Sequence, residues 1–539
     1  MKKINIFVKC LLALVMVAVT SCSDAPDEIT SYLLNRNFSP VDFDVNSVST
    51  TAARLQWTPV DRADKYVVEL FADDSLTFAG SPAKVVETES SSIEVTGLVY
   101  DTKYSARVQA ITTSDPSRTS KYSEVFFRTS AQQFMNSFKE ENIADRSVTA
   151  SWDVEAVGAE VTALRALDAK GKIVSTKELT AEEKAAGRAT IGGLSPETVY
   201  TIKLLNGEKE RGSRTVTTIA DLAGAILLHA GDDIANIIKD AEPNAVLALY
   251  GGVYEIPAED EGKMGAAKIE KNITIKGIYP TNKPIIKGRY EIYEGAALSI
   301  SQVILDGADN ATGDQTFNYK TADVDYGALN LQDVTIKNFV KGICYGNVTA
   351  TIESITFNNC IIDNIECDGG DFFDLRKSYA KKVTFSNSTI SNSAQNRDLI
   401  RYDDSSGSYT DAAPIITVDK CTIYNVLNET KAKRLLYVRF VGNQISWTNN
   451  LLVQTQAVYT NQSKTDPDGI TYDNNYYFNC TNSNLFDPSD SAGETKVYWN
   501  GDTNGKNGSD PQFKNASAGD FTIGNGDVKK LKVGDPRWY

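Results

Sequence analysis

The chain has 539 residues, of which 41% are hydrophobic and 23% charged, and its formal net charge is −15. One hydrophobic core rarely supports a chain of this length, so we expect about two to four domains. The acidic balance disfavours nucleic acid as a partner, because binding phosphate requires a basic face.

Residues 1–21 have the pattern of a secretion signal. Lys2 and Lys3 precede the apolar run CLLALVMVAV, which is too short to span a bilayer and fits the core of a signal peptide. The run ends in VTSC, which resembles a bacterial lipobox, although Val19 stands where leucine is commonest. The alternative is an ordinary secretion signal with a chance cysteine.

The resemblance implies that Cys22 is lipidated and becomes the mature N-terminus, followed by an acidic tether at residues 22–34. Bacteroidetes lipoproteins carry a similar acidic stretch when they are exported to the outer face of the outer membrane. We therefore expect a lipid-anchored protein on the outer membrane that faces the cell exterior. No later stretch is long and apolar enough for a transmembrane helix.

Residues 35–130 and 131–218 each have the pattern of an antiparallel β-sandwich, with alternating strands and a turn signal about every ten residues. Each contains a tryptophan at a core position and a later tyrosine at a tyrosine-corner position: Trp57 with Tyr104, and Trp152 with Tyr200. Both segments resemble fibronectin type III domains. GLSPETVYTIKLL in the second matches the family closely, whereas the first has Tyr100 in place of the family's proline. The resemblance implies spacers or adhesive modules.

Near the start of residues 219–539, the stretch GDDIANIIKDA (231–241) has an apolar spacing that predicts a short helix. A ten-residue unit then recurs every 25–33 residues. Its copies are LNLQDVTIKN (329–338), ITFNNCIIDN (355–364), VTFSNSTISN (383–392), ITVDKCTIYN (416–425), ISWTNNLLVQ (445–454) and ITYDNNYYFN (470–479). This period predicts a right-handed parallel β-helix, which the helix at 231–241 would cap. A leucine-rich solenoid is the alternative, but its leucine pattern is absent.

Stacking of the coils makes two further predictions about side chains. Two internal stacks are expected, one of Ile355, Val383, Ile416, Ile445 and Ile470, and one of Phe357, Phe385, Val418, Trp447 and Tyr472. An asparagine ladder is expected at a bend, formed by Asn338, Asn364, Asn392 and Asn425. The predicted fold class is all-β: two fibronectin type III-like sandwiches followed by the capped β-helix.

The C-terminal stretch SDPQFKNASAGDFTIGNGDVKKLKVGDPRWY (509–539) carries a further resemblance. Residues 219–539 resemble a pectate-lyase-like β-helix family of Bacteroidetes that ends in a similar D-P-x-F … D-F … G-D-P-R-W pattern. The resemblance implies a β-helix with a C-terminal cap in a polysaccharide-utilisation system. Partner enzymes and a surface transporter are then expected.

Three hexapeptides, DFFDLR (371–376), DLIRYD (398–403) and RLLYVR (434–439), place charged or aromatic residues in equivalent slots. Strand alternation sends Asp374, Arg401 and Tyr437 outward in one row, and Arg376, Asp403 and Arg439 in the next. Cross-coil charge pairs alone could explain the pattern as a structural ladder.

A glycan-binding patch is the second interpretation of these six residues. Residues 376–439 contain eleven Lys or Arg against six Asp or Glu within an acidic chain. Arginine binds uronate carboxylates in bidentate fashion, and Tyr437 offers a face for a sugar ring. A polysaccharide, and in particular an acidic pectin-like polymer, is the expected partner.

Catalysis is the third interpretation. DFFDLRKS and LIRYDD faintly resemble the Lys and Arg arrangement of the polysaccharide lyases that include chondroitinase B and alginate lyase. The resemblance implies Arg376 or Lys377 as base and Arg401 as its partner. That family's calcium ligands have no clear counterpart here, and Asp371 and Asp374 are at best substitutes. For the protein as a whole, the sequence leaves three roles open: a polysaccharide-binding protein, a polysaccharide lyase, and a structural or adhesive surface protein without glycan affinity.

No cofactor is expected. DPDG (466–469) and DGADNATGD (306–314) could chelate calcium, but Asp/Gly turns are far commoner. The single histidine, His229, precedes the predicted capping helix, which argues against Ser/His/Asp or Cys/His catalysis. The last five cysteines lack metal-site spacing and are expected to be buried free thiols: Cys344, Cys360, Cys367, Cys421 and Cys480.

Overall fold

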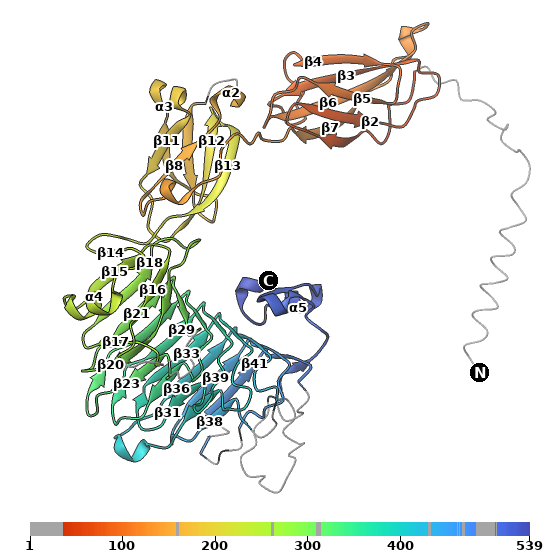
Figure 1. Cartoon of the computed structure of the whole chain (residues 1–539). Coiled ribbons are helices and arrows are strands. Elements are labelled where there is room, and N and C mark those ends of the chain that lie inside the picture. Colours follow the sequence, from red (N-terminus) through yellow and green to blue (C-terminus); the bar gives the residue numbers. More distant parts are fainter. Residues whose placement is uncertain are drawn as a thin grey trace, which may run out of the picture. The chain divides into compact units, whose positions relative to one another are not determined.

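The computed structural model describes residues 36–157, 161–259, 263–308, 314–429, 433–460, 462, 464–465, 469–480, 502 and 504–539. The predicted signal peptide, Cys22 and the acidic tether lie outside these residues. Within the described ranges, no helix is long and apolar enough to cross a membrane. The described residues divide into two compact units (Figure 1), the first comprising those within Met1–Phe138, Thr149–Ile191 and Tyr200–Thr215 and the second the rest. The predicted domain boundaries stay predictions.

The first module is an antiparallel sandwich. One sheet has the order β1-β2-β5 and the other β4-β3-β6-β7. The strands are β1 (Asp44–Val48), β2 (Ala52–Gln56), β3 (Lys65–Ala72), β4 (Lys84–Thr88), β5 (Ser92–Thr96), β6 (Lys103–Ile111) and β7 (Ser123–Arg128). Trp57 is buried in its core, and the Tyr104 hydroxyl accepts a hydrogen bond from the Val99 amide at 3.0 Å. The predicted core tryptophan and tyrosine corner are therefore confirmed.

The second module repeats the antiparallel plan. A four-stranded sheet has the order β10-β9-β12-β13, and β8 pairs with β11. The strands are β8 (Ser147–Ser151), β9 (Ala163–Leu167), β10 (Ile173–Glu178), β11 (Arg188–Gly192), β12 (Val199–Asn206) and β13 (Lys209–Thr217). Two short helices accompany them, α2 (Val154–Val157) and α3 (Ala181–Ala186). Trp152 and Tyr200 are buried, as predicted.

The remaining strands form a parallel β-helix, which confirms the predicted fold (Figure 1). Sheet 1 has ten described strands in the order β14-β15-β18-β21-β25-β29-β33-β36-β39-β41. They are β14 (Ile226–Leu228), β15 (Ala245–Leu249), β18 (Ile273–Gly277), β21 (Leu298–Ser301), β25 (Leu329–Gln332), β29 (Ile355–Asn358), β33 (Lys382–Ser386), β36 (Ile415–Asp419), β39 (Gln444–Thr448) and β41 (Ile470–Asp473). Consecutive strands come from consecutive coils, so each coil adds one strand to the sheet.

Sheet 2 follows sheet 1 around each coil. Its strands are β16 (Val253–Glu255), β19 (Ile285–Lys287), β22 (Ile304–Asp306), β26 (Thr335–Lys337), β30 (Ile361–Asp363), β34 (Thr389–Ser391), β37 (Thr422–Tyr424), β40 (Leu451–Val453), β42 (Tyr476–Phe478) and β43 (Lys506–Asn507). Its inward side chains, such as Ile362, Ile390 and Ile423, are buried in the core of the β-helix.

Sheet 3 completes the coils. Its strands are β17 (Ala266–Ile269), β20 (Arg289–Ile292), β23 (Phe317–Tyr319), β27 (Cys344–Gly346), β31 (Phe373–Leu375), β35 (Ile400–Tyr402) and β38 (Leu436–Val438). A short sheet beside it contains β24 (Asp325–Tyr326), β28 (Thr351–Ile352) and β32 (Tyr379–Ala380). Sheet 3 carries all three hexapeptides of the predicted patch.

The predicted internal stacks are confirmed. Ile355 pairs with Val383, Val383 with Ile416, and the same register continues through Ile445 to Ile470. Phe357 and Phe385 stack with ring centroids 4.7 Å apart. The five cysteines are buried free thiols, as predicted, and burial raises the pKa of the Cys480 thiol to about 11.

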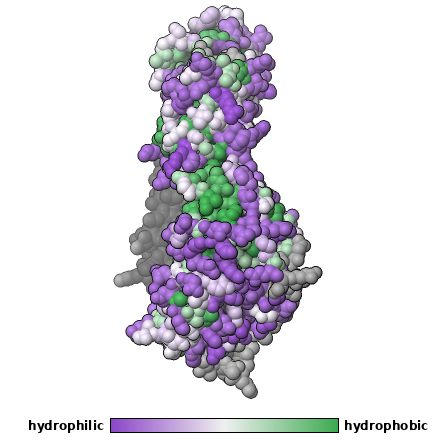
Figure 2. Space-filling model, turned by 60° about the vertical axis from the view of Figure 1, so that its left-hand side comes forward, coloured by the Kyte–Doolittle hydropathy of each residue, from purple (hydrophilic) through white to green (hydrophobic). Residues whose placement is uncertain are grey.

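The predicted helix is α4 (Ile234–Asp240), and it covers the first coil. Asp233 caps it by accepting a hydrogen bond from the Asn236 amide, and Ile234 and Ile238 are buried in the core of the β-helix. The neighbouring edge strand β14 still exposes Ile226 and Leu227. Figure 2, which brings this side forward, shows an apolar area among mostly hydrophilic residues.

Residues 509–539, the C-terminal segment, lie on the flank of sheet 2, whereas a cap over the end of the β-helix was expected. They contain β44 (Phe513–Asn515), β45 (Asp520–Ile523) and α5 (Gly526–Leu531). Their apolar side chains pack on outward residues of sheet 2: Ile523, Val528 and Val533 against Leu451, Val453 and Tyr476. The flank receives them because sheet 2 presents apolar residues outward there.

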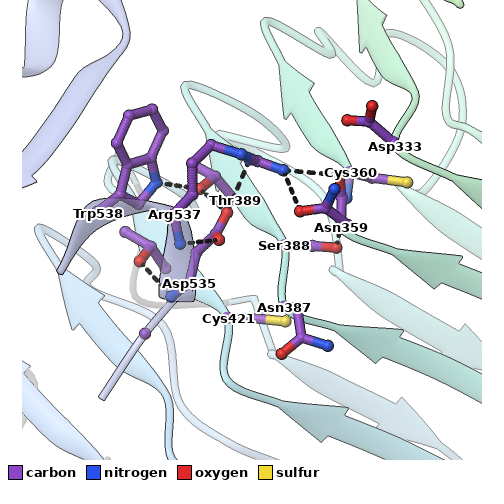
Figure 3. A network of polar contacts seen from close by, with 12 residues as sticks. Asp333, Asn359, Cys360, Asn387, Ser388, Thr389, Cys421, Asp535, Arg537 and Trp538 are labelled. Atoms are coloured by element: carbon purple, nitrogen blue, oxygen red, sulfur yellow. Dashed lines mark hydrogen bonds and ion pairs between the residues drawn. The ribbon is translucent and has the colours of Figure 1, made fainter. Parts of the chain in front are cut away.

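Polar contacts then tie the end of the C-terminal segment to successive coils (Figure 3). The Asp535 amide donates to the Thr422 hydroxyl at 2.9 Å, and the Trp538 indole donates to the Thr389 hydroxyl at 2.7 Å. Arg537 donates to the backbone carbonyl and the side-chain oxygen of Asn359, both at 2.7 Å, and pairs with Asp535 at 2.9 Å. The segment therefore bridges several coils.

Candidate functional site

The outward row of sheet 3 is aligned as the hexapeptides predict. Asp374 lies beside Arg401, and Arg401 beside Tyr437, in direct register. The residues between them, including Phe373 and Tyr402, point inward and are buried. Toward the first coil the same row continues through Tyr345, Asn318, Glu291 and Lys268. The row is thus a continuous polar track, one residue per coil.

The second predicted row lies just beyond the strand ends. The Asp403 amide donates to the Leu375 carbonyl at 2.8 Å, and the Arg439 amide donates to the Tyr402 carbonyl at 2.7 Å. These bonds hold Arg376, Asp403 and Arg439 one above another on successive coils. The structure therefore brings all six predicted patch residues together.

The expected charge pairing between coils at the strand ends is wrong. We expected Arg376 to face Asp403 and Asp403 to face Arg439. Instead Arg376 folds back along its own strand, and its Nε and Nη2 lie 3.2 and 2.9 Å from the Asp374 carboxylate. Asp374 has no exposed side-chain surface, whereas Arg376 keeps 35%. A buried carboxylate needs a close counter-charge, and the long arginine two residues on supplies it.

Arg401 is held by three carboxylates. Its guanidinium lies 2.8 Å from Asp403, 3.1 Å from Asp371 and 3.7 Å from Asp374. Burial alone would lower the pKa of Arg401, but the hydrogen bonds with Asp403 and Asp371 outweigh it and raise the pKa. Arg401 is therefore permanently charged and committed to partners within the protein.

The contacts of Arg376 do not suit the role of a catalytic base. Its hydrogen bonds with Asp374 raise the pKa of the guanidinium, so it stays protonated. Burial raises the pKa of Asp374, although Arg376 and Arg401 oppose the change. Lys377 is exposed. A lyase mechanism would need a base beside Arg401, and the protonated Arg376 does not supply one.

Two carboxylates have a structural role that the sequence analysis did not predict: Asp371, considered there only as a substitute calcium ligand, and Asp398. Asp371 accepts a hydrogen bond from the Asp398 amide at 3.0 Å. Asp398 in turn accepts from the Arg434 amide and from its guanidinium, both at 2.8 Å. Burial raises the pKa of Asp398 despite Arg434. The sequence carried a signal for this role, because Asp371, Asp398 and Arg434 are the first residues of the three hexapeptides and so share one slot of the repeat.

Tyr437 is surrounded by guanidinium groups. Those of Arg434, Arg401 and Arg439 lie 4.5, 5.3 and 5.9 Å from its ring centroid. The ring is thus a cation–π partner for the arginines and holds them as a group. These arginines therefore compete with a sugar ring for the faces of Tyr437, whose predicted role in sugar binding stays a prediction.

Arg439 and Lys377 differ from the other patch cations. Among the described residues, neither has a carboxylate within ion-pair distance, and Arg439 makes one long hydrogen bond, 3.4 Å, to the Tyr437 hydroxyl. Arg376, Arg401 and Arg434 each have such a partner. Arg439 and Lys377 stand near the strand ends of sheet 3, two coils or about 10 Å apart. They are the cations that a ligand could recruit.

Metal binding by Asp371 and Asp374 is disfavoured because both carboxylates are ion-paired with arginine. No group of three or more His, Cys, Asp or Glu residues within the described ranges could hold a metal ion. Parts of DPDG (466–469) and of 306–314 lie outside those ranges. Of the latter, Asp306 is paired with Lys337 at 3.1 Å.

Comparisons with known proteins bear on each part of the chain. Residues 38–125 match the model of the fibronectin type III domain. Residues 252–393 match the model "Domain of unknown function (DUF4957)", and residues 416–538 match "Domain of unknown function (DUF5123)". No curated protein matches the chain.

Solved structures similar to the chain contain fibronectin type III domains. A two-domain segment of chicken tenascin is 23% identical and covers 34% of this chain and 99% of its own, with a TM-score of 0.23. The fn3 domain of human collagen alpha-1(XX) is 18% identical and covers 22% and 99%, with a TM-score of 0.16. The FN5 domain of Drosophila Lar is 21% identical and covers 18% and 98%, with a TM-score of 0.15.

The architecture narrows the class of protein. A fibronectin type III module followed by a β-helix suggests a surface, adhesive or binding protein.

Proposed function

We propose that this protein binds an acidic polysaccharide at the cell surface through the strand ends of sheet 3. The observation that carries the proposal is that two cations, Arg439 and Lys377, have no carboxylate partner among the described residues, in a patch whose other arginines are ion-paired. Carboxylates of a uronate chain would supply ion-pair partners for these two cations. Asp374, Arg376, Arg401, Asp403 and Tyr437 then act as the support that holds Arg439 in place.

The proposal includes the context that the sequence suggests. Lipidation at Cys22 would anchor the protein to the outer membrane, and the sandwich modules would act as spacers. The glycan would be held for partner enzymes and a transporter of a polysaccharide-utilisation system, as in Bacteroidetes. A pectin-like polymer is favoured because it carries many uronate carboxylates along one chain, so that two of them can pair with cations on different coils.

The test is calorimetry of the mature protein with a panel of acidic and neutral polysaccharides. Arg439→Ala and Lys377→Ala should each weaken binding of the acidic polymer by about tenfold, since each removes one charge-assisted contact. Added salt should weaken wild-type binding further. Lys382→Ala, which removes an exposed lysine from sheet 1, is the matched control and should bind as wild type.

Equal binding by all three variants, or an absence of binding on every polymer, would overturn the proposal and leave a structural or adhesive protein. Arg401→Ala is unsuitable as a binding probe, because it strips the counter-charge from Asp371 and Asp403 and should destabilise the fold. The ultraviolet absorbance of unsaturated uronates, read in the same mixtures, would reveal a lyase.

A further inference from the structure

A cavity of about 210 Å³ lies beside the short sheet that contains β24 and β28. Its lining residues are Asp323, Val324, Asp325, Thr349, Ala350, Thr351 and Tyr409. This is smaller than the roughly 300–1,000 Å³ of sites for drug-sized ligands, so it suits a single small ring. None of the lining residues belongs to the six-residue patch on sheet 3.

The aromatic wall of the cavity is fixed in place. The Tyr409 hydroxyl accepts a hydrogen bond from the Ala350 amide at 2.9 Å and lies 2.6 Å from the Lys377 carbonyl. Its ring packs against Tyr379 at 5.3 Å and Phe440 at 6.1 Å between centroids. A ring held at both ends is preorganised, so a ligand stacking on it would not have to order it.

The bond to the Lys377 carbonyl also places the cavity next to the proposed binding site. Lys377 is one of the two patch cations that have no carboxylate partner in the part of the chain that the structure describes, and Tyr409 forms a wall of the cavity. A single hydrogen bond therefore joins the two features. A chain of sugars that contacts Lys377 would reach the cavity with its next residues.

The remaining wall is acidic and hydroxylic. Asp323 and Asp325 are exposed, and among the described residues neither side chain has a hydrogen bond or an ion pair. Lys381, a nearby cation, is paired with Glu353. Carboxylate oxygens accept hydrogen bonds from sugar hydroxyls, but they repel a uronate. The cavity thus selects against the acidic residues that Arg439 and Lys377 attract.

We infer that the cavity lined by Tyr409, Asp323 and Asp325 is a subsite for one neutral sugar ring of the bound glycan. The inference rests on the proposed function and extends it. The ligand would be a mixed polymer in which neutral sugars alternate with uronates, because adjacent parts of the site have opposite charge preferences.

The test compares two polymers, a galacturonate homopolymer and an alternating galacturonate–rhamnose polymer, on the mature protein by calorimetry. Wild type should bind the alternating polymer about tenfold more tightly. Asp325→Ala and Asp323→Asn should remove that preference, because each removes a carboxylate that accepts from a neutral sugar and repels a uronate, and neither should weaken binding of the homopolymer. Asparagine suits position 323, whose φ is +59°. Glu366→Gln, which changes an exposed carboxylate that does not line the cavity, is the control and should retain the preference.

The outcomes separate the two proposals. Cavity variants that keep the preference for the alternating polymer would overturn the subsite, and so would a preference that disappears when calcium is removed, since that would indicate a cation site. Loss of homopolymer binding in Arg439→Ala would still support the proposed function in either case. A wild-type protein that binds neither polymer would overturn both.

Discussion

Asp374 shows how a single buried residue sets the chemistry of its surroundings. Its carboxylate is fully buried, is paired with Arg376 and lies near Asp371 and Arg401. Burial raises its pKa above the ordinary value of about 3.9. Asp306 on sheet 2 is the opposite case: burial would raise its pKa, but hydrogen bonds from Asn338 and the Ala308 amide, together with Lys337, lower it.

These two directions predict opposite dependences of stability on pH. A raised native pKa means that the native state binds the proton more tightly, so the contribution of Asp374 grows as pH falls through that pKa. A lowered native pKa means that the contribution of Asp306 is complete above the ordinary value and declines below it. Between about pH 7 and about pH 3.5, the difference in unfolding free energy between wild type and Asp374→Asn should shift in favour of wild type as the pH falls. Over the same range, the difference between wild type and Asp306→Asn should shift against wild type.

Urea denaturation of the three proteins across this range measures both differences. Parallel curves for the two variants would contradict the assignment. The groups that face Asp374 include Arg376, Arg401, Asp371 and Tyr345, and none of them is changed in either variant.

The residues of the patch illustrate what a sequence can reveal at this scale. The alternation of inward and outward side chains has a period of two, so the hexapeptides predicted both rows correctly. The partners of each arginine could not be predicted, because a long side chain can turn along its own strand or across to the next. Arg376 turns back along its own strand because Asp374 is buried and needs a counter-charge, and burial depends on the packing of neighbouring coils.

At the scale of the structural element, the bends of the coils carry two ladders of left-handed residues. The predicted ladder is present: Asn338, Asn364, Asn392 and Asn425 have φ between +48° and +61°. Asn364 donates to Asn338 at 3.0 Å and Asn425 to Asn392 at 2.9 Å, whereas Asn392 donates to Asp363 at 2.9 Å. The amide ladder is therefore real but interrupted once by a carboxylate.

The second ladder lies at the bend between sheets 1 and 2 and was not predicted. Its members also have positive φ: Gln302, Asp333, Asn359, Asn387, Lys420, Asn449 and Asn474. The signal was the fifth residue of each ten-residue unit, which is Asn in four of the six copies. Lys420 masks it, because lysine is not a residue that favours left-handed backbone.

Asn392 allows the backbone and ladder contributions to be separated. Asn392→Gly keeps the left-handed conformation and loses two hydrogen bonds, which should lower the free energy of unfolding by about 1–2 kcal/mol. Asn392→Ala adds the strain of an alanine at φ +48°, and should cost about 1 kcal/mol more. Chemical denaturation of the three proteins provides the comparison. Equal losses in the two variants would show that the backbone relaxes.

At the scale of the whole molecule, the C-terminal segment changes how the coils depend on one another. In a solenoid each repeat contacts only its neighbours, so stability is close to a sum of local terms. Here the Gly534 amide bonds the Asn449 carbonyl, and the contacts of Asp535, Trp538 and Arg537 reach the coils of Thr422, Thr389 and Asn359 in turn. Four coils are thereby joined by residues that belong to none of them.

Gly534→Ala tests this coupling. Gly534 has φ +82°, and an added Cβ would lie 2.6 Å from the Thr422 hydroxyl and 2.9 Å from the Leu451 side chain. The control is Gly519→Ala, at φ +78° with no atom within 4 Å. Both variants have the strain of an alanine at positive φ, but only Gly534→Ala also has the clash. The clash should lower the free energy of unfolding by a further 1–3 kcal/mol or so.

Hydrogen exchange should then show faster exchange across β34, β37 and β40 together in Gly534→Ala. Faster exchange confined to β40 would contradict the coupling of several coils.

The parallel β-helix itself was predictable because its repeat is visible in the sequence. The position of the C-terminal segment was not, since a single non-repeating stretch has no register to copy.

The contact between Arg537 and Asn359 spans 178 positions of the sequence, and this has a consequence for the order of events in synthesis. Coils can stack as soon as they emerge, each on the one before. The bridge across four of them has to wait until residue 537 has been made and, for a secreted chain, delivered. Until that moment the outer side of sheet 2 at Leu451 and Tyr476 is bare apolar surface, which a chaperone or a second copy could occupy. The last residues to arrive thus determine when the coils made earlier become safe from aggregation.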